Sequence, residues 1–197
     1  MHHDSMSDRS AHVALLEHLR SVFPGQVIDE LAGVEGPIES RVPGFRVYRI
    51  HPRVAGGWWL YVSSGCWAAT QEHGHGLEFF LAAPRDDWQN LESITMNAYY
   101  HCGPPRQRLD VGHTVPIGRP WLDDSSCDHY LVSPPYPFGP DFELCEWGTG
   151  AHARILWLLP ITKAEKDFRR THGLEALESL LEEHMIDPVD PGRASVV

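Results

Sequence analysis

The feature that most constrains the fold is an apolar run in the last quarter of the chain. Residues Ile155–Ile161 form the longest apolar run of the sequence. A strand that is apolar along its whole length is typical of a position inside a sheet that is covered on both faces. At about seven residues, the run is much shorter than the about 20 that a membrane-spanning helix needs. It therefore predicts a strand with packed layers on both sides and no membrane span.

Helical periodicity marks four further segments. Apolar residues recur three or four positions apart in them, and Pro or Gly stands at most of their ends. The helices are expected over residues 11–23, from 86 or 87 to 102, over 162–173 and over 174–186. Thr162 and Glu165 have the spacing of a capping box, and Asp86 with Gln89 has the same spacing at the start of the second helix.

Aromatic or β-branched runs predict strands between these helices. The strands are expected over residues 45–50, 58–62, 77–82, 129–133, 143–147 and 154–159. An order in which helices are separated by several strands is typical of the α+β class. We therefore predict a central mixed or antiparallel sheet with helices packed on it.

The length of 197 residues fits a single hydrophobic core. Seven Trp, six Tyr and seven Phe supply the large side chains that such a core buries. Both ends of the chain lack apolar periodicity, which is typical of loose termini. We predict a flexible N-terminus over residues 1–10, one domain over 11–190 and a flexible C-terminus over 191–197.

The chain is acidic, with 16 Lys and Arg against 27 Asp and Glu and a net charge of −11. Such a surface repels phosphate backbones, which argues against nucleic-acid binding. It favours a basic partner, because long-range attraction raises the rate of encounter. The candidate basic patch consists of Arg41, Arg46, Arg49 and Arg53.

The start of the chain and its cysteines bear on the compartment. A polar start without an apolar signal segment, and four cysteines without a C-x-x-C pair, favour a reducing cytoplasmic setting.

Zinc binding is the first chemical alternative. His73 and His75 form an H-x-H pair, and Cys127 and His129 form a C-x-H pair. Together they offer four ligands of the type that zinc prefers. Structural zinc sites usually contain closely spaced cysteine pairs, which this chain lacks, so we expect no metal. The glycines beside His73 and His75 favour a turn before the strand that begins at Leu77.

A Cys–His nucleophile and a pair of carboxylates are two further alternatives. The residues concerned are Cys66, Cys102, His75, His113, Glu72 and Glu78. Nothing in the sequence fixes either geometry. Glu78 interrupts an apolar strand, where a carboxylate needs water or a buried partner such as arginine. We therefore favour structural roles for these residues and expect no enzyme.

Several of these features form one ordered pattern. It consists of residues 57–65 (GWWLYVSSG), residues 73–81 (HGHGLEFFL), Gly112-His113, Ser133-Pro134-Pro135, and residues 155–165 with their P-I-T-x-x-E end. The pattern resembles the Suppressor of fused (SUFU) domain over roughly residues 30–195. The chain is similar to the compact single-domain form found in bacteria, since it lacks the long second domain and the disordered insert of the animal protein.

The resemblance implies a non-catalytic binding role. Bacterial members of the family resemble immunity proteins that are encoded beside polymorphic toxins. The resemblance therefore implies that the chain binds and neutralises a cognate toxin domain, and its acidic charge suits a basic toxin such as a nuclease. No cofactor, nucleic acid or membrane is expected to take part. The alternatives are a regulator that captures a peptide, as the animal relatives do, and a metal hydrolase that uses His73, His75, Glu78 and His113.

The candidate partner-binding residues come from the patterned block and from a Pro-rich loop. They are His73, His75, Glu78, His113, Tyr136, Phe138 and Asp141. Exposed sheet edges or the loop over residues 134–140 could pair with a strand of the partner. We expect His113→Ala to destabilise the domain before it affects any chemistry.

Overall fold

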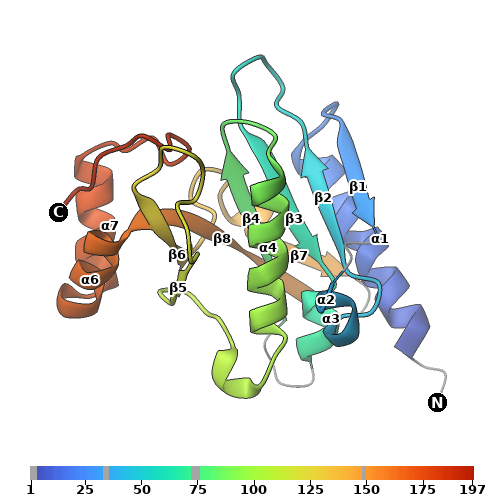
Figure 1. Cartoon of the computed structure of the whole chain (residues 1–197). Coiled ribbons are helices and arrows are strands. Elements are labelled where there is room, and N and C mark those ends of the chain that lie inside the picture. The colour runs from blue at the N-terminus through green and yellow to red at the C-terminus, as the bar shows by residue number, and fades with distance from the viewer. Residues whose placement is uncertain (1–3, 33–35, 72–75, 148–149) are drawn as a thin grey trace.

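One mixed β-sheet organises the molecule (Figure 1). The computed structural model describes residues 4–32, 36–71, 76–147 and 150–197. Within these residues, eight strands form a sheet in the order β1-β2-β3-β4-β8-β6-β5, and β7 pairs with β8 beside this path. In chain order the strands are β1 (Ile28–Ala32), β2 (Arg46–Ile50), β3 (Trp59–Ser64), β4 (Leu77–Ala83), β5 (Thr114–Pro116), β6 (Cys127–Ser133), β7 (Leu144–Trp147) and β8 (Ala151–Thr162).

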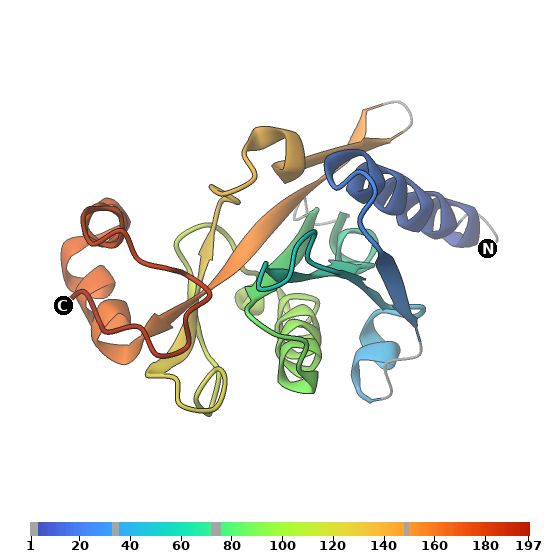
Figure 2. The same cartoon turned by 90° about the horizontal axis from the view of Figure 1, so that it is seen from above.

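Helices cover both faces of this sheet. They are α1 (Asp4–Val22), α2 (Ile38–Arg41), α3 (Cys66–Thr70), α4 (Trp88–His101), α5 (Pro140–Glu143), α6 (Lys163–His172) and α7 (Leu174–Glu183). Seen from above, α1 and α5 lie on one face and α4 lies on the opposite face, where it packs on β3 and β4 (Figure 2). α6 and α7 pack together at the end of the sheet, and α6 contacts β6 and β8.

The strand directions confirm the predicted class. β4 and β8 run parallel, and the other strand pairs of the described residues run antiparallel. The sheet is therefore mixed, and helices pack on both of its faces, as expected for an α+β fold.

β8 is the strand on which the rest of the sheet is assembled. It pairs with β4 on one side and with β6 and β7 on the other. Its residues from Ile155 to Thr162 are buried, which confirms the interpretation of the apolar run as a strand covered on both faces. None of the helices in the described ranges is long and apolar enough to cross a membrane.

The start of α6 follows its predicted capping box. The Thr162 hydroxyl accepts a hydrogen bond from the Glu165 amide at 3.2 Å, and the Glu165 carboxylate accepts one from the Thr162 amide at 2.8 Å. Each side chain therefore satisfies an amide that the first helical turn leaves without a partner.

The cap of α4 lies one residue later than the predicted spacing suggested. Asp87 is the cap, and its carboxylate accepts a hydrogen bond from the Gln89 amide at 3.0 Å. Asp86 turns towards the sheet instead, where it bonds the guanidinium of Arg49 at 2.8 Å and the hydroxyl of Tyr61. These tertiary partners, which the local sequence does not reveal, determine which carboxylate is available for capping.

α1 begins earlier than its apolar residues indicated. It starts at Asp4, so part of the segment expected to be flexible over residues 1–10 is helical. Leu15 and Leu19 of this helix lie in the core. The extension carries polar residues without an apolar stripe, and hydrophobic periodicity gives no signal for such a turn.

The C-terminal segment packs against α6, although the sequence predicted a flexible end over residues 191–197. Arg193 and Glu165 form a buried bidentate ion pair, with Nη1–Oε1 and Nη2–Oε2 distances of 2.7 Å each. The Val196 amide donates a further hydrogen bond to Glu165 at 3.1 Å. Single side chains make these contacts, so a search for apolar periodicity does not detect them.

Candidate functional site

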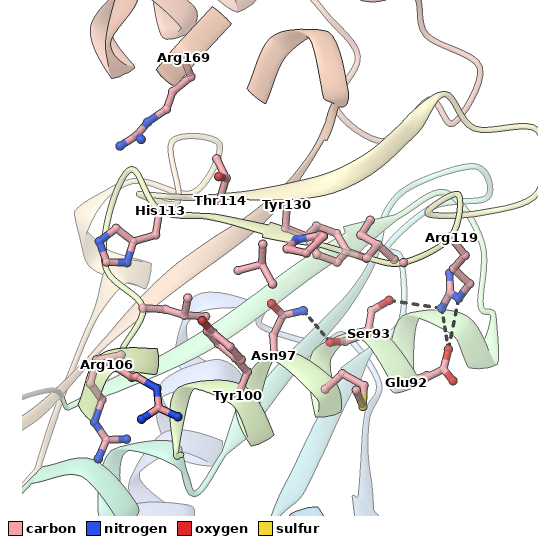
Figure 3. A pocket seen from close by; sticks show the side chains of 17 residues that line it. Glu92, Ser93, Asn97, Tyr100, Arg106, His113, Thr114, Arg119, Tyr130 and Arg169 are labelled. Carbon is pink, nitrogen blue, oxygen red and sulfur yellow. Dashed lines mark hydrogen bonds and ion pairs between the residues drawn. The ribbon is translucent and has the colours of Figure 1, made fainter. Parts of the chain in front are cut away.

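A groove of about 740 Å³ runs between α4 and the edge strand β5 (Figure 3). α4 forms one wall, to which Ser93, Met96, Asn97 and Tyr100 contribute. β5 and the residues on either side of it form the other wall. A hollow of this size is within the range that proteins use to bind ligands.

β5 leaves one side open for further pairing, because it is the last strand of the sheet. Its bonds to β6 continue beyond the strand to the Ile117 amide, which donates to the Asp128 carbonyl at 2.9 Å. Bonded and open positions alternate in an antiparallel pair, so the backbone of Thr114 faces away from β6. Pro116 has no amide, which shortens the open edge. Backbone pairing at this edge can therefore fix only a short stretch of a partner strand.

The floor of the groove contains buried polar atoms without partners. Asn97 is 5% exposed, and its amide nitrogen donates to the Ser93 carbonyl at 2.8 Å, while its Oδ1 atom bonds nothing in the described residues. The hydroxyl of Tyr130 also lacks a partner there. Burial raises the pKa of Tyr130, so its hydroxyl stays protonated. Because an unsatisfied buried polar atom costs free energy, a ligand that bonds it gains affinity.

An apolar ridge on α4 borders the groove. Trp88 and Met96 are 67% and 58% exposed, and Tyr100 is 39% exposed. Their spacing of eight and four residues places them on one face of the helix. On the other side of the ridge, Pro37 and Ile38 line a second hollow of about 330 Å³ together with Trp88 and Met96. Large apolar side chains gathered on one exposed face are typical of a binding surface.

One end of the groove is basic. Figure 3 shows Arg106 and Arg169 on either side of His113 at this end, and Arg108 lines the same groove. Within the described residues, none of these three arginines forms an ion pair with a carboxylate. The Nε atoms of Arg108 and Arg169 are buried and have no hydrogen-bond partner in this part of the chain.

Gly112 allows Arg169 to lie close to the backbone beside β5. Its φ of +85° is in the left-handed region that favours glycine. A Cβ atom at this position would stand 3.1 Å from Nη2 of Arg169 and 3.3 Å from Leu174. The glycine of the Gly112-His113 pair therefore leaves room for Arg169 at the basic end of the groove.

An ion pair closes the opposite end of the groove. Arg119 Nη2 lies 2.7 Å from Glu92 Oε2, and the same guanidinium donates to the carbonyls of Gln89 at 3.2 Å and Trp121 at 2.8 Å. These bonds connect the segment after β5 to α4. They fix the width of the groove at this end and leave Arg119 neutralised.

The five predicted binding residues that the structure describes do not form one site. His73 and His75 lie outside the described residues. His113 lines the basic end of the groove. The remaining four lie elsewhere, in the core or on the other face of the sheet.

Glu78 is a buried support of the β3–α3 turn, and a partner cannot reach its carboxylate. It is 3% exposed and accepts hydrogen bonds from the Ser63 hydroxyl at 2.6 Å and from the Gly65 and Trp67 amides at 2.8 and 3.0 Å. The buried partner is therefore a set of neutral donors and not the arginine that the sequence suggested. Burial raises the pKa of Glu78 to about 7, because these donors offset only part of the lost hydration.

The Pro-rich loop leads into α5, which lies on the α1 face of the sheet, opposite α4 (Figure 2). Tyr136 is exposed and donates to a glutamate of α7 at 3.1 Å. Phe138 turns inward, and its ring centroid lies 5.2 Å from that of Phe142. Asp141 is exposed on α5. These three residues therefore do not contribute to the groove.

The Cys–His alternative does not fit the surroundings of Cys66. Its Sγ atom is buried 3.7 Å from the Ser63 hydroxyl, and burial raises the pKa of its thiol. A thiol that stays protonated is a poor nucleophile. In the ranges that the structure covers, no three His, Cys, Asp or Glu side chains are grouped as a metal site requires.

Two of the four arginines of the expected basic patch are neutralised, whereas Arg41 and Arg53 form no ion pair within the described residues. Arg46 and Arg49 pair with acidic residues of β1 at 2.7 and 2.6 Å. The groove residues that the sequence analysis missed are Asn97, Arg106, Arg108 and Arg169. They come from a helix, a loop and a second helix far along the chain, so no local spacing marks them as a group.

His113→Ala is expected to lower the free energy of unfolding by less than about 1 kcal/mol. The imidazole is exposed and accepts one hydrogen bond, from the Asp110 amide at 3.2 Å. The His113 carbonyl bonds the Val132 amide whatever the side chain is. This expectation replaces the strong destabilisation predicted from the sequence, and urea unfolding measures it. A loss of several kcal/mol would restore the earlier interpretation.

Comparisons with known proteins agree with the resemblance. Residues 42–194 match the family described as Suppressor of fused protein (SUFU). The structure of a SUFU homologue from Neisseria gonorrhoeae FA 1090 is 35% identical, with a TM-score of 0.84, and the match covers 96% of this chain and 98% of that one. Drosophila Suppressor of Fused shares the fold at 14% identity and a TM-score of 0.69, over 95% of this chain and 51% of that one.

A curated relative is similar over a shorter region. Immunity protein YqcF of Bacillus subtilis (strain 168) is 34% identical over 76 residues, which is 38% of this chain and 38% of that protein. The match therefore spans well under half of that relative. The profile match and the structure from Neisseria gonorrhoeae both extend over most of the sequence. The chain belongs to the Suppressor of fused (SUFU) family.

Proposed function

We propose that this chain is an immunity protein that binds a cognate toxin domain and neutralises it without catalysis, using the groove between α4 and β5. Membership of the SUFU family and the partial similarity to a protein named an immunity protein support this function. The proposed location of the binding surface rests on one observation, the apolar ridge of α4 beside a groove with unsatisfied polar atoms.

The ridge and the groove together have the composition of a protein interface. Exposed Trp88, Met96 and Tyr100 supply the aromatic and methionine side chains that are enriched at interface centres. The groove beside them supplies polar atoms that can fix the register of a bound segment. A partner that covers both surfaces would remove the ridge from water and satisfy the buried atoms in one event.

Capture of a regulatory peptide is the second candidate function, and the open side of β5 favours it. A short extended peptide could pair with the Thr114 backbone and extend the sheet by one strand. The two functions use the same groove and differ in what the partner does when it is free. Only a toxin stops growth, so rescue of growth distinguishes them.

Met96→Asp is expected to abolish protection of cells that produce the cognate toxin. Met96 borders both hollows, so a carboxylate there would be desolvated against apolar surface. Loss of a central interface side chain costs about 2 kcal/mol or more, which is roughly a 30-fold weaker complex. The assay co-expresses the chain with each neighbouring toxin gene, scores growth, and then measures affinity for the purified toxin domain by calorimetry.

Met185→Asp is the matched control for this variant. Met185 is 87% exposed just after α7 and lines neither hollow. The control should protect cells as well as the unchanged chain does. Equal protection by Met96→Asp and Met185→Asp would show that the toxin binds another surface, and failure of the chain to protect against any neighbouring toxin would contradict the immunity function.

A further inference from the structure

We propose that the groove selects an acidic, extended segment of the partner, whose carboxylates are held at the end formed by Arg106, Arg108 and Arg169. The inference rests on the proposed use of the groove for partner binding and adds the chemistry of what it accepts. It differs from the expectation of a basic partner that followed from the acidic net charge. The whole molecule attracts a basic partner at long range, whereas the groove presents arginines that attract an acidic segment at short range.

The charges inside the groove carry the argument. Among the described residues that line it, four are arginines and one is acidic. The acidic residue, Glu92, is already paired with Arg119 at 2.7 Å. The other three arginines have no carboxylate partner in the described part of the chain, although the protein has 27 Asp and Glu. Asp110, close to His113 in the sequence, uses its carboxylate to accept the Val111 amide at 2.8 Å.

Two of these guanidinium groups carry unsatisfied donors. The Nε atoms of Arg108 and Arg169 are buried without an acceptor. A buried cationic donor without a partner is costly, so an incoming anionic acceptor gains more here than at a solvated arginine. The flat guanidinium presents paired N–H groups that match the two oxygens of a carboxylate. Figure 3 shows Arg106 and Arg169 on opposite sides of His113, so successive carboxylates of an extended segment can each meet a different arginine.

The unsatisfied acceptor deeper in the groove distinguishes a peptide from other anions. Asn97 Oδ1 needs a donor, and a peptide backbone brings N–H groups together with its acidic side chains. Inorganic phosphate and the nucleic-acid backbone offer acceptors to the arginines and no amide to Asn97. The open backbone of Thr114 at the β5 edge adds a second place for a peptide amide or carbonyl to pair.

The test uses designed peptides, so it does not require the natural partner. A fluorescent eight-residue peptide of alternating Glu and Thr is compared with matched Gln–Thr and Lys–Thr peptides and with a single-stranded DNA octamer. Anisotropy measures the affinities at low salt, and amide chemical shifts locate the bound peptide. We expect the Glu–Thr peptide to bind about tenfold or more tightly than the Gln–Thr peptide, to shift resonances of Asn97 and Thr114, and to weaken as salt rises.

Arginine variants connect this binding to the groove. Arg169→Ala is expected to weaken Glu–Thr binding about tenfold or more, and Arg106→Ala provides a second variant at an exposed position in case the first fails to fold. The control is Arg170→Ala, on the same helix, because Arg170 is exposed, lies outside the groove and forms an ion pair with Asp167 at 3.6 Å. Equal affinity of the Glu–Thr and Gln–Thr peptides, tighter binding of the DNA, or equal loss in the control overturns the inference.

The growth assay separates this inference from the proposed function. We expect Arg106→Glu combined with Arg169→Glu to lose protection as Met96→Asp does. Loss with Met96→Asp but not with the reversed charges overturns the acidic-segment inference and leaves the proposed function intact. Protection that survives both changes overturns the groove as the binding surface, and the inference with it.

Discussion

Arg193→Ala is expected to lower the free energy of unfolding by about 3–5 kcal/mol, because it leaves a buried carboxylate without its cation. Glu165 is fully buried, and Arg193 contacts both of its oxygens at 2.7 Å. The guanidinium also donates to the Pro160 carbonyl at 3.0 Å. Removal of the side chain therefore breaks its bonds to β8 and α6, and leaves the Val196 amide as a remaining donor to Glu165. Urea unfolding at pH 7 measures the loss.

The pH dependence of this loss follows from Glu165. Burial alone would raise the pKa of Glu165, but the hydrogen bonds and charge of Arg193 outweigh burial and lower it. A lowered pKa in the folded state stabilises the protein above the ordinary pKa of a glutamate, and this contribution disappears as the pH falls through the folded value. The difference between the unchanged protein and Arg193→Ala should therefore shrink in acid.

Arg170→Ala is the control for the Arg193 experiment as well, because Arg170 is 73% exposed. Its loss should stay within about 0.5 kcal/mol. The double variant Arg193→Met with Glu165→Leu removes both charges and should restore much of the stability that Arg193→Ala loses. A loss below about 1 kcal/mol for Arg193→Ala would mean that the C-terminal segment contributes little to the fold.

The free energy of unfolding of Glu78→Gln is expected to rise relative to that of the unchanged protein as the pH increases. The change in this difference should be about 3 kcal/mol between pH 4.5 and pH 8. Burial raises the pKa of Glu78 from 4.5 to about 7 in the folded state. Between these values the unfolded chain loses the proton while the folded chain keeps it, so stability falls with rising pH and is constant above about 7. Glutamine has no proton to lose and removes this dependence.

Glutamine can also keep most of the hydrogen bonds of Glu78. Its carbonyl oxygen can accept the Gly65 and Trp67 amides, and its amide can donate to the Ser63 hydroxyl after that hydroxyl rotates. Unfolding in urea at pH 4.5, 5.5, 6.5 and 8 measures the effect for both proteins. Glu146→Gln is the control, because it removes an exposed carboxylate from β7. Parallel pH curves for Glu78→Gln and the unchanged protein would show that Glu78 is ionised in the fold.

The parts of the fold with strong local signals were predictable. The apolar run of β8 and the Thr162–Glu165 capping box are both present where the sequence placed them. β1 (Ile28–Ala32) and β5 (Thr114–Pro116) were missed, because each is short and contains acidic residues or proline. Such strands form because a neighbouring strand offers hydrogen bonds, which is a tertiary effect and not a propensity.

The candidate site was less predictable than the fold. His113 was identified through the sequence pattern, but its neighbours Arg106, Arg108 and Arg169 had no common motif. Their proximity depends on the packing of α6 against β6 and β8, which only the folded chain determines. Phe138 is a residue that the sequence wrongly placed at the binding surface. Its position in a Pro-rich loop suggested exposure, but its ring packs against Phe142.

The parallel pairing of β4 with β8 has a consequence for synthesis on the ribosome. Leu77 of β4 pairs with Arg154 of β8, so β4 cannot form this pairing until the intervening residues and β8 have been translated. At about 5–20 residues per second, this delay is roughly 4–15 seconds. During it the nascent N-terminal half exposes an apolar strand that could pair with another chain, so a chaperone that shields this strand would increase the yield of folded protein.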